Sequence, residues 1–178
     1  GGVDNIDIHA ATKQGVYVCY VPDANVIPVA EHVIALLFVL SKRIRLLDEE
    51  VRRGNFAIRN QNLPKELLGK TLGIVGLGKI GRQVTKRAGK GLGMKVGAFD
   101  PYVTAQEARR LEVTFSSSLK KMLARSDAIT LHVPLTEKTK HLIGTEEFHS
   151  MKPSAWFINT SRGGLVDEGA LIDALKSG

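Results

Sequence analysis

Hydrophobic and polar residues follow two different patterns along the chain, and the change falls near residue 70. From residue 71 onward, short apolar runs alternate with segments whose apolar residues recur every three or four positions. The short runs predict strands, and the amphipathic segments predict helices. We expect strands at 71–76, 95–100, 113–115, 128–133 and 155–160, and helices at 79–92, 104–111, 117–125, 145–151 and from near Asp167 onward.

This alternation of strands and helices determines the expected fold class. It is typical of βαβ units with right-handed crossovers, which build a parallel sheet with helices on both faces. We therefore predict a doubly wound α/β fold with the usual strand order 3-2-1-4-5. In that order strands 1 and 4 are neighbours, and ligands bind outside the carboxyl ends of the strands there.

The first 70 residues have a different pattern of hydrophobic and polar positions. The run "GVYVCYVP" (15–22) predicts a strand, and the segment 29–54 predicts one long helix that ends near Gly54. Pro28 suits the first turn of that helix, because the missing N–H would have no intrahelical partner there. The first half of the helix is apolar nearly all round, which predicts that it lies between two bodies. We expect 55–70 to be an irregular connection.

Composition narrows the class of protein. The chain has 178 residues, of which 43% are hydrophobic and 24% charged, and this supports one sizeable core in a globular protein. The only cysteine, Cys19, lies in an apolar run and is predicted to be a buried small hydrophobe. The longest apolar stretch includes Glu31 and His32 and is too short for a bilayer span. With no signal peptide pattern, a cytoplasmic location is the expectation.

A formal net charge of +7 raises the question of nucleic-acid binding. The basic residues are scattered, however, and no zinc spacing, stacking motif or basic helix accompanies them. We therefore expect no nucleic-acid partner and favour steering of an anionic small ligand. His9, His32, His141 and His149 show no ligand spacing, so we predict no metal site.

A glycine-rich turn joins the first strand to the following helix. "GIVGLGKIG" places Gly76, Gly78 and Gly81 in the pattern G-x-G-x-x-G. Gly76 would allow the tight turn, Gly78 would let a pyrophosphate approach the backbone, and Gly81 would let helix and strand pack closely. The N-terminus of the helix would offer free N–H groups to the phosphates. The pattern predicts a dinucleotide site of the Rossmann type.

An acidic residue ends the next strand at the distance such a site requires. Asp100 lies about 20 residues beyond the last glycine, where a carboxylate binds the ribose hydroxyls. Pro101 and Tyr102 follow, with no arginine to neutralise a 2′-phosphate, which favours NAD over NADP. The alternative is a surface aspartate that caps the turn before Pro101.

The fifth strand ends in "NTSRGG", which carries Arg162 to the same edge of the sheet. A guanidinium there can bind a carboxylate through two hydrogen bonds and polarise an adjacent keto oxygen. The alternative is a surface salt bridge. Asp167 suits the N-cap of the last helix, with Leu171 and Leu175 on the buried face.

Two further residues at this edge, His132 and Ser161, belong to types that often take part in catalysis. His132 ends the fourth strand and is the local candidate for a proton donor, with a packing or cofactor-contact role as the alternative. Ser161 lacks the pattern G-x-S-x-G, which argues against a hydrolase.

Several motifs together resemble the D-isomer-specific 2-hydroxyacid dehydrogenases, most closely the D-3-phosphoglycerate dehydrogenase branch. They are "GGVDNIDIHAATKQGVYVCYVP", "LGKTLGIVGLGKIG", "FDPY", "LHVPLTEKTKHLIG" and "INTSRGGLVDEGALIDAL". The resemblance implies hydride transfer between NAD(H) and a small 2-hydroxy or 2-keto acid in a homodimer. It implies that Arg162 is the substrate-binding catalytic residue. The expected cofactor-binding residues are Ala30, Gly76, Gly78, Lys79, Ile80, Gly81, Asp100, His132, Val133, Pro134, Thr139, Thr160, Ser161 and Arg162.

The resemblance also sets the expected domain organisation. In this family the acid/base histidine and its carboxylate partner lie downstream of the arginine, and the sequence ends at Gly178. We therefore expect a fragment of a two-domain enzyme, inactive alone, whose cofactor domain lacks its last strand. The expected divisions are 1–28, end of the substrate domain; 29–54, interdomain helix; 55–70, connection; and 71–178, truncated NAD-binding domain.

Two alternative functions remain open. One is an NADH-responsive binding module, like the corepressors built on the same framework. The other is an NAD-dependent formate dehydrogenase, within the same family. The identity of the 2-hydroxy acid stays open as well.

Overall fold

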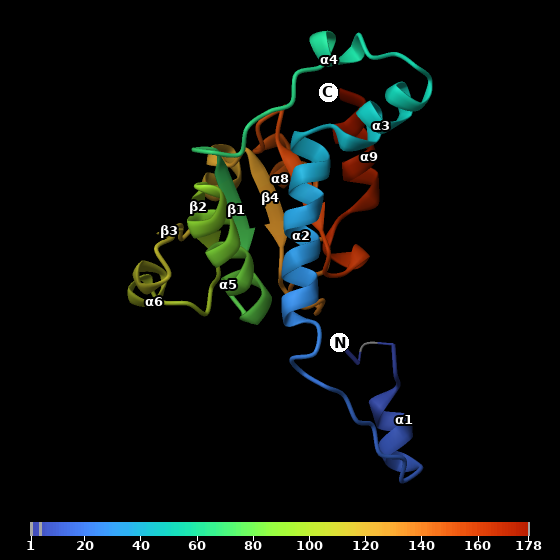
Figure 1. Ribbon diagram of the computed structural model, residues 1–178. Coiled ribbons are helices and arrows are strands. Elements are labelled where there is room, and N and C mark those ends of the chain that lie inside the picture. The colour runs from blue at the N-terminus through green and yellow to red at the C-terminus, as the bar shows by residue number, and fades with distance from the viewer. Residues whose placement is uncertain (1, 4, 178) are drawn as a thin grey trace.

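The computed structural model describes residues 2–3 and 5–177, and its centre is a five-stranded parallel sheet (Figure 1). The order is β3-β2-β1-β4-β5, as predicted. Registered pairs such as Val75 with Phe99 and Leu131 with Asn159 bring the carboxyl ends of four strands to one edge. The strands are β1 (Thr71–Val75), β2 (Lys95–Phe99), β3 (Thr114–Phe115), β4 (Ala128–Leu131) and β5 (Trp156–Asn159).

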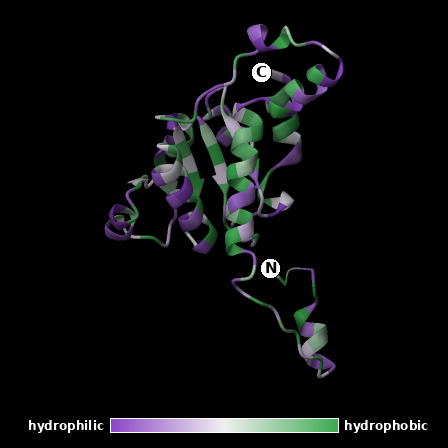
Figure 2. Cartoon of the chain, in the orientation of Figure 1, coloured by the Kyte–Doolittle hydropathy of each residue, from purple (hydrophilic) through white to green (hydrophobic). Residues whose placement is uncertain are grey.

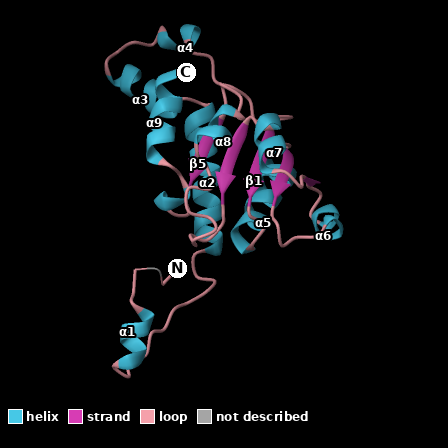
Figure 3. Ribbon diagram, turned by 180° about the vertical axis from the view of Figure 1, so that it is seen from behind, coloured by secondary structure: helices cyan, strands magenta, loops and turns pink. Residues whose placement is uncertain are grey.

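Helices cover both faces of the sheet, which gives three layers. One face carries α2 (Val26–Ser41) and α5 (Lys79–Lys86), while α6 (Ala105–Arg110) packs beside β3 (Figure 1). The opposite face carries α7 (Leu119–Arg125) and α8 (Thr145–His149), and α9 packs on α8 (Figure 3). The other helices are α1 (Ile8–Lys13), α3 (Ile44–Arg52), α4 (Ile58–Gln61), α9 (Glu168–Ser177), a π-helix (Arg87–Gly91) and a 3₁₀ helix (Gly163–Leu165). No helix in the described part of the chain is long and apolar enough to cross a membrane.

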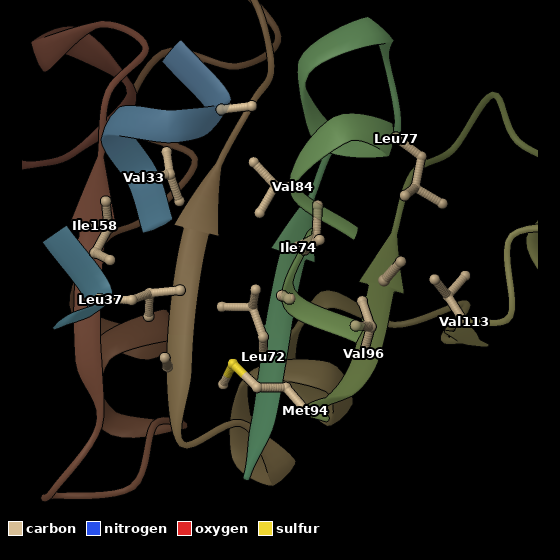
Figure 4. Close-up of a cluster of buried hydrophobic side chains, with 14 of the residues drawn as sticks. Val33, Leu37, Leu72, Ile74, Leu77, Val84, Met94, Val96, Val113 and Ile158 are labelled. Atoms are coloured by element: carbon tan, nitrogen blue, oxygen red, sulfur yellow. The ribbon is translucent and has the colours of Figure 1, made fainter. Parts of the chain in front are cut away.

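The core forms two clusters because successive residues of a strand face opposite sides of the sheet. On the α2 and α5 face, Leu72 and Ile74 of β1 pack with Leu37 and Val84 of the helices (Figure 4). On the other face, Val75 and its neighbours pack against α7 and the loop residues that follow α8 and β5. Figure 2 shows hydrophobic residues on the strands and α2, and hydrophilic residues on α4 and α6. Complete burial of each such side chain stabilises the fold by roughly 1.5–3 kcal/mol.

The N-terminal segment (residues 5–25) departs from the prediction. The run 15–22 forms no strand, Tyr17 is 95% exposed and Cys19 is also exposed, so the predictions of a strand and of a buried cysteine were wrong. A strand needs a neighbour to pair its N–H and C=O groups. Among the described residues no strand lies beside this run, and Figure 1 shows the segment extending below the sheet with α1 at its far end.

The predicted long helix 29–54 is two helices, α2 and α3. The backbone turns at Arg43, whose φ of 52° lies in the left-handed region and ends the helical hydrogen bonding. The connection that follows α4 stabilises this break, because the N–H of Lys65 donates to the carbonyl of Ser41 (2.8 Å) and Lys42 Nζ donates to the carbonyl of Lys65 (3.0 Å). Pro28 lies in the first turn of α2, as expected.

Two smaller differences concern helix ends. The helix after the glycine turn is α-helical only to Lys86 and continues as the π-helix, in a stretch that contains Gly89 and Gly91. In α9, Leu171 packs against the core, but Leu175 is 75% exposed, so its predicted burial was wrong.

Candidate functional site

The glycine turn holds α5 closely against the end of β1. Gly76 has a φ of 97°, and a Cβ there would lie 2.7 Å from the carbonyl oxygen of His132. A Cβ on Gly81 would lie 2.1 Å from the carbonyl oxygen of Gly76. Both positions therefore need glycine, one for its conformation and one for the close approach of helix and strand.

Gly78 leaves open space in front of the N-terminus of α5. It is the N-cap residue, with no side-chain hydrogen bond to the helix, and a Cβ there would meet nothing within 4 Å. The first N–H groups of a helix have no intrahelical partner and attract anions. The adjacent Lys79 forms an ion pair with Asp23, and Ile80 is half-buried against the core. The backbone at Gly78 is therefore open to an approaching anion.

Asp100 lies at the end of β2 and faces the glycine turn. Its Oδ2 accepts a hydrogen bond from the N–H of Leu77, and its Oδ1 accepts one from the N–H of Tyr102, both at 2.8 Å. The second bond is the turn cap that the sequence suggested as the alternative role of Asp100. Each carboxylate oxygen can accept another hydrogen bond. The residue is thus held in place while it retains the capacity to bind hydroxyl groups.

His132 follows β4 and is half-buried. Its Nε2 lies 3.1 Å from Thr130 Oγ1, and its Nδ1 is buried with no hydrogen-bond partner within the described structure. Burial lowers the pKa of His132 to about 4, because the charged imidazolium loses its hydration there. The ring is therefore neutral at neutral pH. This argues against the proton-donor role.

The loop after β4 is closed by its own hydrogen bonds. Thr139 Oγ1 donates to the carbonyl of Pro134 (2.6 Å) and accepts from the N–H of Thr136 (2.8 Å). Val133 packs beside Gly76, where a Cβ on the glycine would lie 2.8 Å from Val133 Cγ1. The loop therefore holds these candidate residues next to the glycine turn.

The turn after β5 is also fixed by side chains. Asn159 accepts from the N–H of Ser161 (3.0 Å) and donates to the carbonyl of Arg162 (2.8 Å). Ser161 Oγ donates to the carbonyl of Leu131 (3.0 Å), which ties the turn to β4. Thr160 Oγ1 is buried with no hydrogen-bond partner within the described structure. Sequence reasoning missed Asn159, although asparagine before a turn is a known signal of such bonds.

Arg162 is half-buried at this turn, and its Nη1 donates to the carbonyl of Ser161 (2.9 Å). The 3₁₀ helix follows, and Gly164 packs against Leu135 of the loop after β4. Asp167 then caps α9 through the N–H of Ala170 (3.0 Å), as predicted. The guanidinium is thus anchored next to the loop that follows β4.

These positions lie along one edge of the sheet. The order β2-β1-β4-β5 places Asp100, Gly78, His132 and Arg162 after four adjacent strands. Strands lie about 5 Å apart, so the row extends over roughly 14 Å. Ala30 differs from the other candidates, because it belongs to α2 and its side chain is fully buried in the core. Among the described residues no group of three or more His, Cys, Asp or Glu side chains could hold a metal ion.

The fold and this edge together define a dinucleotide-binding α/β domain. A parallel sheet with neighbouring β1 and β4, a glycine turn before a helix and a carboxylate after β2 are the parts of that site. The chain belongs to the D-isomer-specific 2-hydroxyacid dehydrogenases, since residues 34–178 match the family model "D-isomer specific 2-hydroxyacid dehydrogenase, NAD binding domain".

Individual relatives support the same assignment. The chain is 45% identical to D-3-phosphoglycerate dehydrogenase of Methanocaldococcus jannaschii over 99% of its residues, which is 33% of that protein. It is similar to the apo-structure of D-lactate dehydrogenase from Escherichia coli, with a TM-score of 0.89, 39% identity and coverage of 99% of this chain and 54% of that chain. D-lactate dehydrogenase from Aquifex aeolicus, complexed with NAD and lactic acid, matches with a TM-score of 0.88 at 36% identity, over 99% of this chain and 52% of that chain.

The matches cover nearly all of this chain but only part of each relative. The chain spans about a third of the length of the D-3-phosphoglycerate dehydrogenase and about half of the two D-lactate dehydrogenase chains. Almost the whole chain is therefore accounted for by the family, while much of each relative has no counterpart in it.

Proposed function

We propose that the chain is the NAD-binding part of an enzyme that transfers hydride between NAD(H) and C2 of a small 2-hydroxy or 2-keto acid. The observation that carries this proposal is the single edge on which Gly78, Asp100 and Arg162 follow neighbouring strands. An anion-binding helix end, a hydroxyl-binding carboxylate and a carboxylate-binding guanidinium are the three groups that this reaction needs from the domain.

The residues of the glycine turn and Asp100 would hold the cofactor. NAD(H), when bound, would supply or accept the hydride. The N–H groups at the start of α5 would bind the pyrophosphate in the open space before Gly78, and the carboxylate of Asp100 would accept hydrogen bonds from ribose hydroxyls. A carboxylate also repels a 2′-phosphate, which favours NAD. The other candidate cofactor contacts, from Lys79 and Ile80 to Val133, Pro134, Thr139, Thr160 and Ser161, belong to the same proposal.

Arg162 would bind the substrate and assist its reduction. Its planar guanidinium can grip the substrate carboxylate and polarise the neighbouring C2 oxygen, which gains negative charge as hydride arrives. By similarity to the D-3-phosphoglycerate dehydrogenases, we propose a phosphorylated three-carbon acid as the substrate and serine biosynthesis as the pathway. The substrate contacts beyond Arg162 would come from the rest of the whole protein.

The proton donor would also come from outside this chain. His132 follows β4, and with a pKa of about 4 its ring is uncharged at neutral pH, which argues against a role as the general acid. We propose that His132 instead supports the cofactor site as a neutral side chain. The chain alone would then bind NAD weakly and turn over nothing.

The proposed function also includes assembly of the whole protein into a homodimer. α2 leaves Ile27, Val39 and Leu40 at 37–41% exposure, and apolar side chains exposed on one helix favour contact with another body. We propose a cytoplasmic homodimer, with α2 near the contact between domains or subunits.

NAD binding can be tested with one substitution and a matched control. Gly78→Ala would place a methyl group in the space proposed for the pyrophosphate, and we expect at least a tenfold increase in the NMR-measured Kd for NAD. The melting temperature should stay unchanged, because the new Cβ meets nothing within 4 Å. Gly91→Ala is the control, since its Cβ also meets nothing within 4 Å but it lies in the π-helix. Equal NAD affinity in all three proteins would overturn the proposed cofactor site.

Catalysis can be tested separately with NADH and hydroxypyruvate or phosphohydroxypyruvate. We expect no turnover by the chain alone. Clear turnover that depends on NADH would show that a proton donor lies within these 178 residues, and the assignment of His132 would then be wrong.

A further inference from the structure

A cavity of about 390 Å³ lies away from the sheet edge that carries the proposed NAD site. It lies between α5 with its π-helix, the start of β2 and the turn after α6, and contains none of the proposed NAD-binding residues. In Figure 1 these elements lie on the left side of the molecule. The lining residues are Arg82, Thr85, Lys86, Gly89, Lys90, Met94, Val96, Arg110, Leu111 and Glu112.

The floor of this cavity is apolar. Met94 and Val96 belong to the core cluster that Figure 4 shows, and Leu111 packs against the same cluster. A volume of about 390 Å³ lies within the roughly 300–1,000 Å³ typical of small-molecule sites, which combine apolar walls with a few polar groups. The floor can therefore cover a small apolar group.

The rim of the cavity is strongly basic. Arg82, Lys86 and Lys90 follow each other at four-residue intervals, and Arg110 faces them from the end of α6. Lys90 Nζ lies 3.1 Å from the carboxylate of Glu112. Arg82 Nη2 lies 3.7 Å from Glu107, and Arg82 Nε donates to the carbonyl of Leu77.

Two of these cations remain uncompensated. Of the ion pairs and side-chain hydrogen bonds formed by the described residues, none involves Lys86 or Arg110. Like charges spaced four residues apart on a helix destabilise it. Because Lys86 and Arg110 form no ion pair with a described residue that would stabilise the fold, their placement at the rim of a cavity points to a negatively charged ligand.

We propose that the cavity binds a small phosphomonoester. The phosphate would lie between Lys86 and Arg110, since arginine offers a fork of donors to phosphate oxygens and lysine a compact positive charge. The organic part would cover Met94, Val96 and Leu111. The ligand would thus bind beside α5, at a place distinct from the N-terminus of that helix, and would act independently of the proposed NAD site.

Phenyl phosphate is a suitable probe, because it combines a phosphate with a small apolar ring. In an NMR titration of the 178-residue chain, we expect saturable shifts at residues around the cavity. Lys86→Gln/Arg110→Gln should raise the Kd at least tenfold, while the melting temperature stays unchanged. The matched control is Lys121→Gln/Arg125→Gln on α7, which removes the same charge from two exposed residues on the opposite face of the sheet. Phenol, which has the ring but no phosphate, should not bind.

Competition distinguishes this site from the proposed NAD site. The Kd of phenyl phosphate should be the same with and without saturating NAD, and inorganic phosphate should bind more weakly than phenyl phosphate. Displacement by NAD, equal loss in both double variants or equal affinity for inorganic phosphate would overturn the proposal. So would an absence of binding, or binding of a DNA duplex in place of phenyl phosphate.

Discussion

The sheet with its covering helices (residues 26–41 and 71–177) and the N-terminal segment (residues 5–25) contain similar apolar runs, which are buried in the first region and exposed in the second. In β1, Leu72 and Ile74 are fully buried between the sheet and its helices. In the N-terminal segment, Tyr17 is 95% exposed and Tyr20 is 60% exposed. Figure 2 shows hydrophobic residues in both regions, and Figure 1 shows that only one region has layers on either side of them.

An apolar, β-branched run becomes a strand only where a neighbouring strand can pair with it. β1 lies between β2 and β4, which pair all of its ladder positions. The run 15–22 has comparable β propensity but no neighbour among the described residues. Propensity for strand formation depends mainly on such neighbours. The stability of the described structure should therefore come from the sheet and its helices.

Removing one apolar side chain from each region gives the largest expected contrast. Ile74→Ala should lower the free energy of unfolding by about 2–5 kcal/mol, because it leaves a cavity in the core. Tyr17→Ala should change it by less than about 0.5 kcal/mol. Urea denaturation followed by circular dichroism measures both. A similar loss in the two variants would show that the N-terminal segment packs against another apolar surface in solution.

The pH dependence of stability should come in part from His132. Its pKa is about 4 in the folded state, below its ordinary value of 6.5, so the unfolded chain binds the proton more tightly. Its contribution is therefore fully present above pH 6.5 and is lost as the pH falls towards 4, by up to about 3 kcal/mol. His132→Gln should remove this part of the acid destabilisation when unfolding is measured between pH 7 and pH 4.

A histidine in the N-terminal segment supplies the control. His9 lies on α1 and is exposed, so His9→Gln makes the same replacement without touching a buried ring. We expect this variant to retain the acid destabilisation of the parent protein. If His9→Gln and His132→Gln flatten the pH profile equally, burial of His132 is not its cause.

Helix caps give the smallest contrast. Asp167 caps α9 at 3.0 Å and Asp7 caps α1 at 2.8 Å, each through a backbone N–H. Asp167→Ala should lower the free energy of unfolding by about 1 kcal/mol. Asp7→Ala should leave the melting temperature unchanged, because α1 has six residues and buries none of them. An equal shift in melting temperature would mean that α1 unfolds together with the sheet.

Most of the sheet could be predicted from sequence, because its signals are local. The five strands, their order, the glycine turn and the N-cap Asp167 all follow from apolar period, glycine spacing and capping chemistry. The strand after α7 is shorter than predicted and ends at Leu131. The break between α2 and α3 could not be predicted, because it depends on hydrogen bonds from residues 62–65, which lie about 20 positions further along the chain.

The candidate site also has a part that could be predicted from the sequence and a part that could not. The positions of Asp100 and Arg162 after their strands follow from the sequence, while the supports of the site do not. Asn159, which holds the turn before Arg162, gives only the general signal of an asparagine before a turn, and Thr130, which contacts His132, gives none. Their roles depend on which atoms the finished turn and strand bring within hydrogen-bond distance.

The alternation of strands and helices and the residues that follow each strand can be inferred from the sequence alone, since both depend on periodicity and on the conformational limits of glycine. Which apolar residues are buried, where the long helical pattern breaks and whether His132 is charged depend on the tertiary structure. Those outcomes depend on neighbours distant in sequence, because burial, strand pairing and desolvation are properties of the packed molecule.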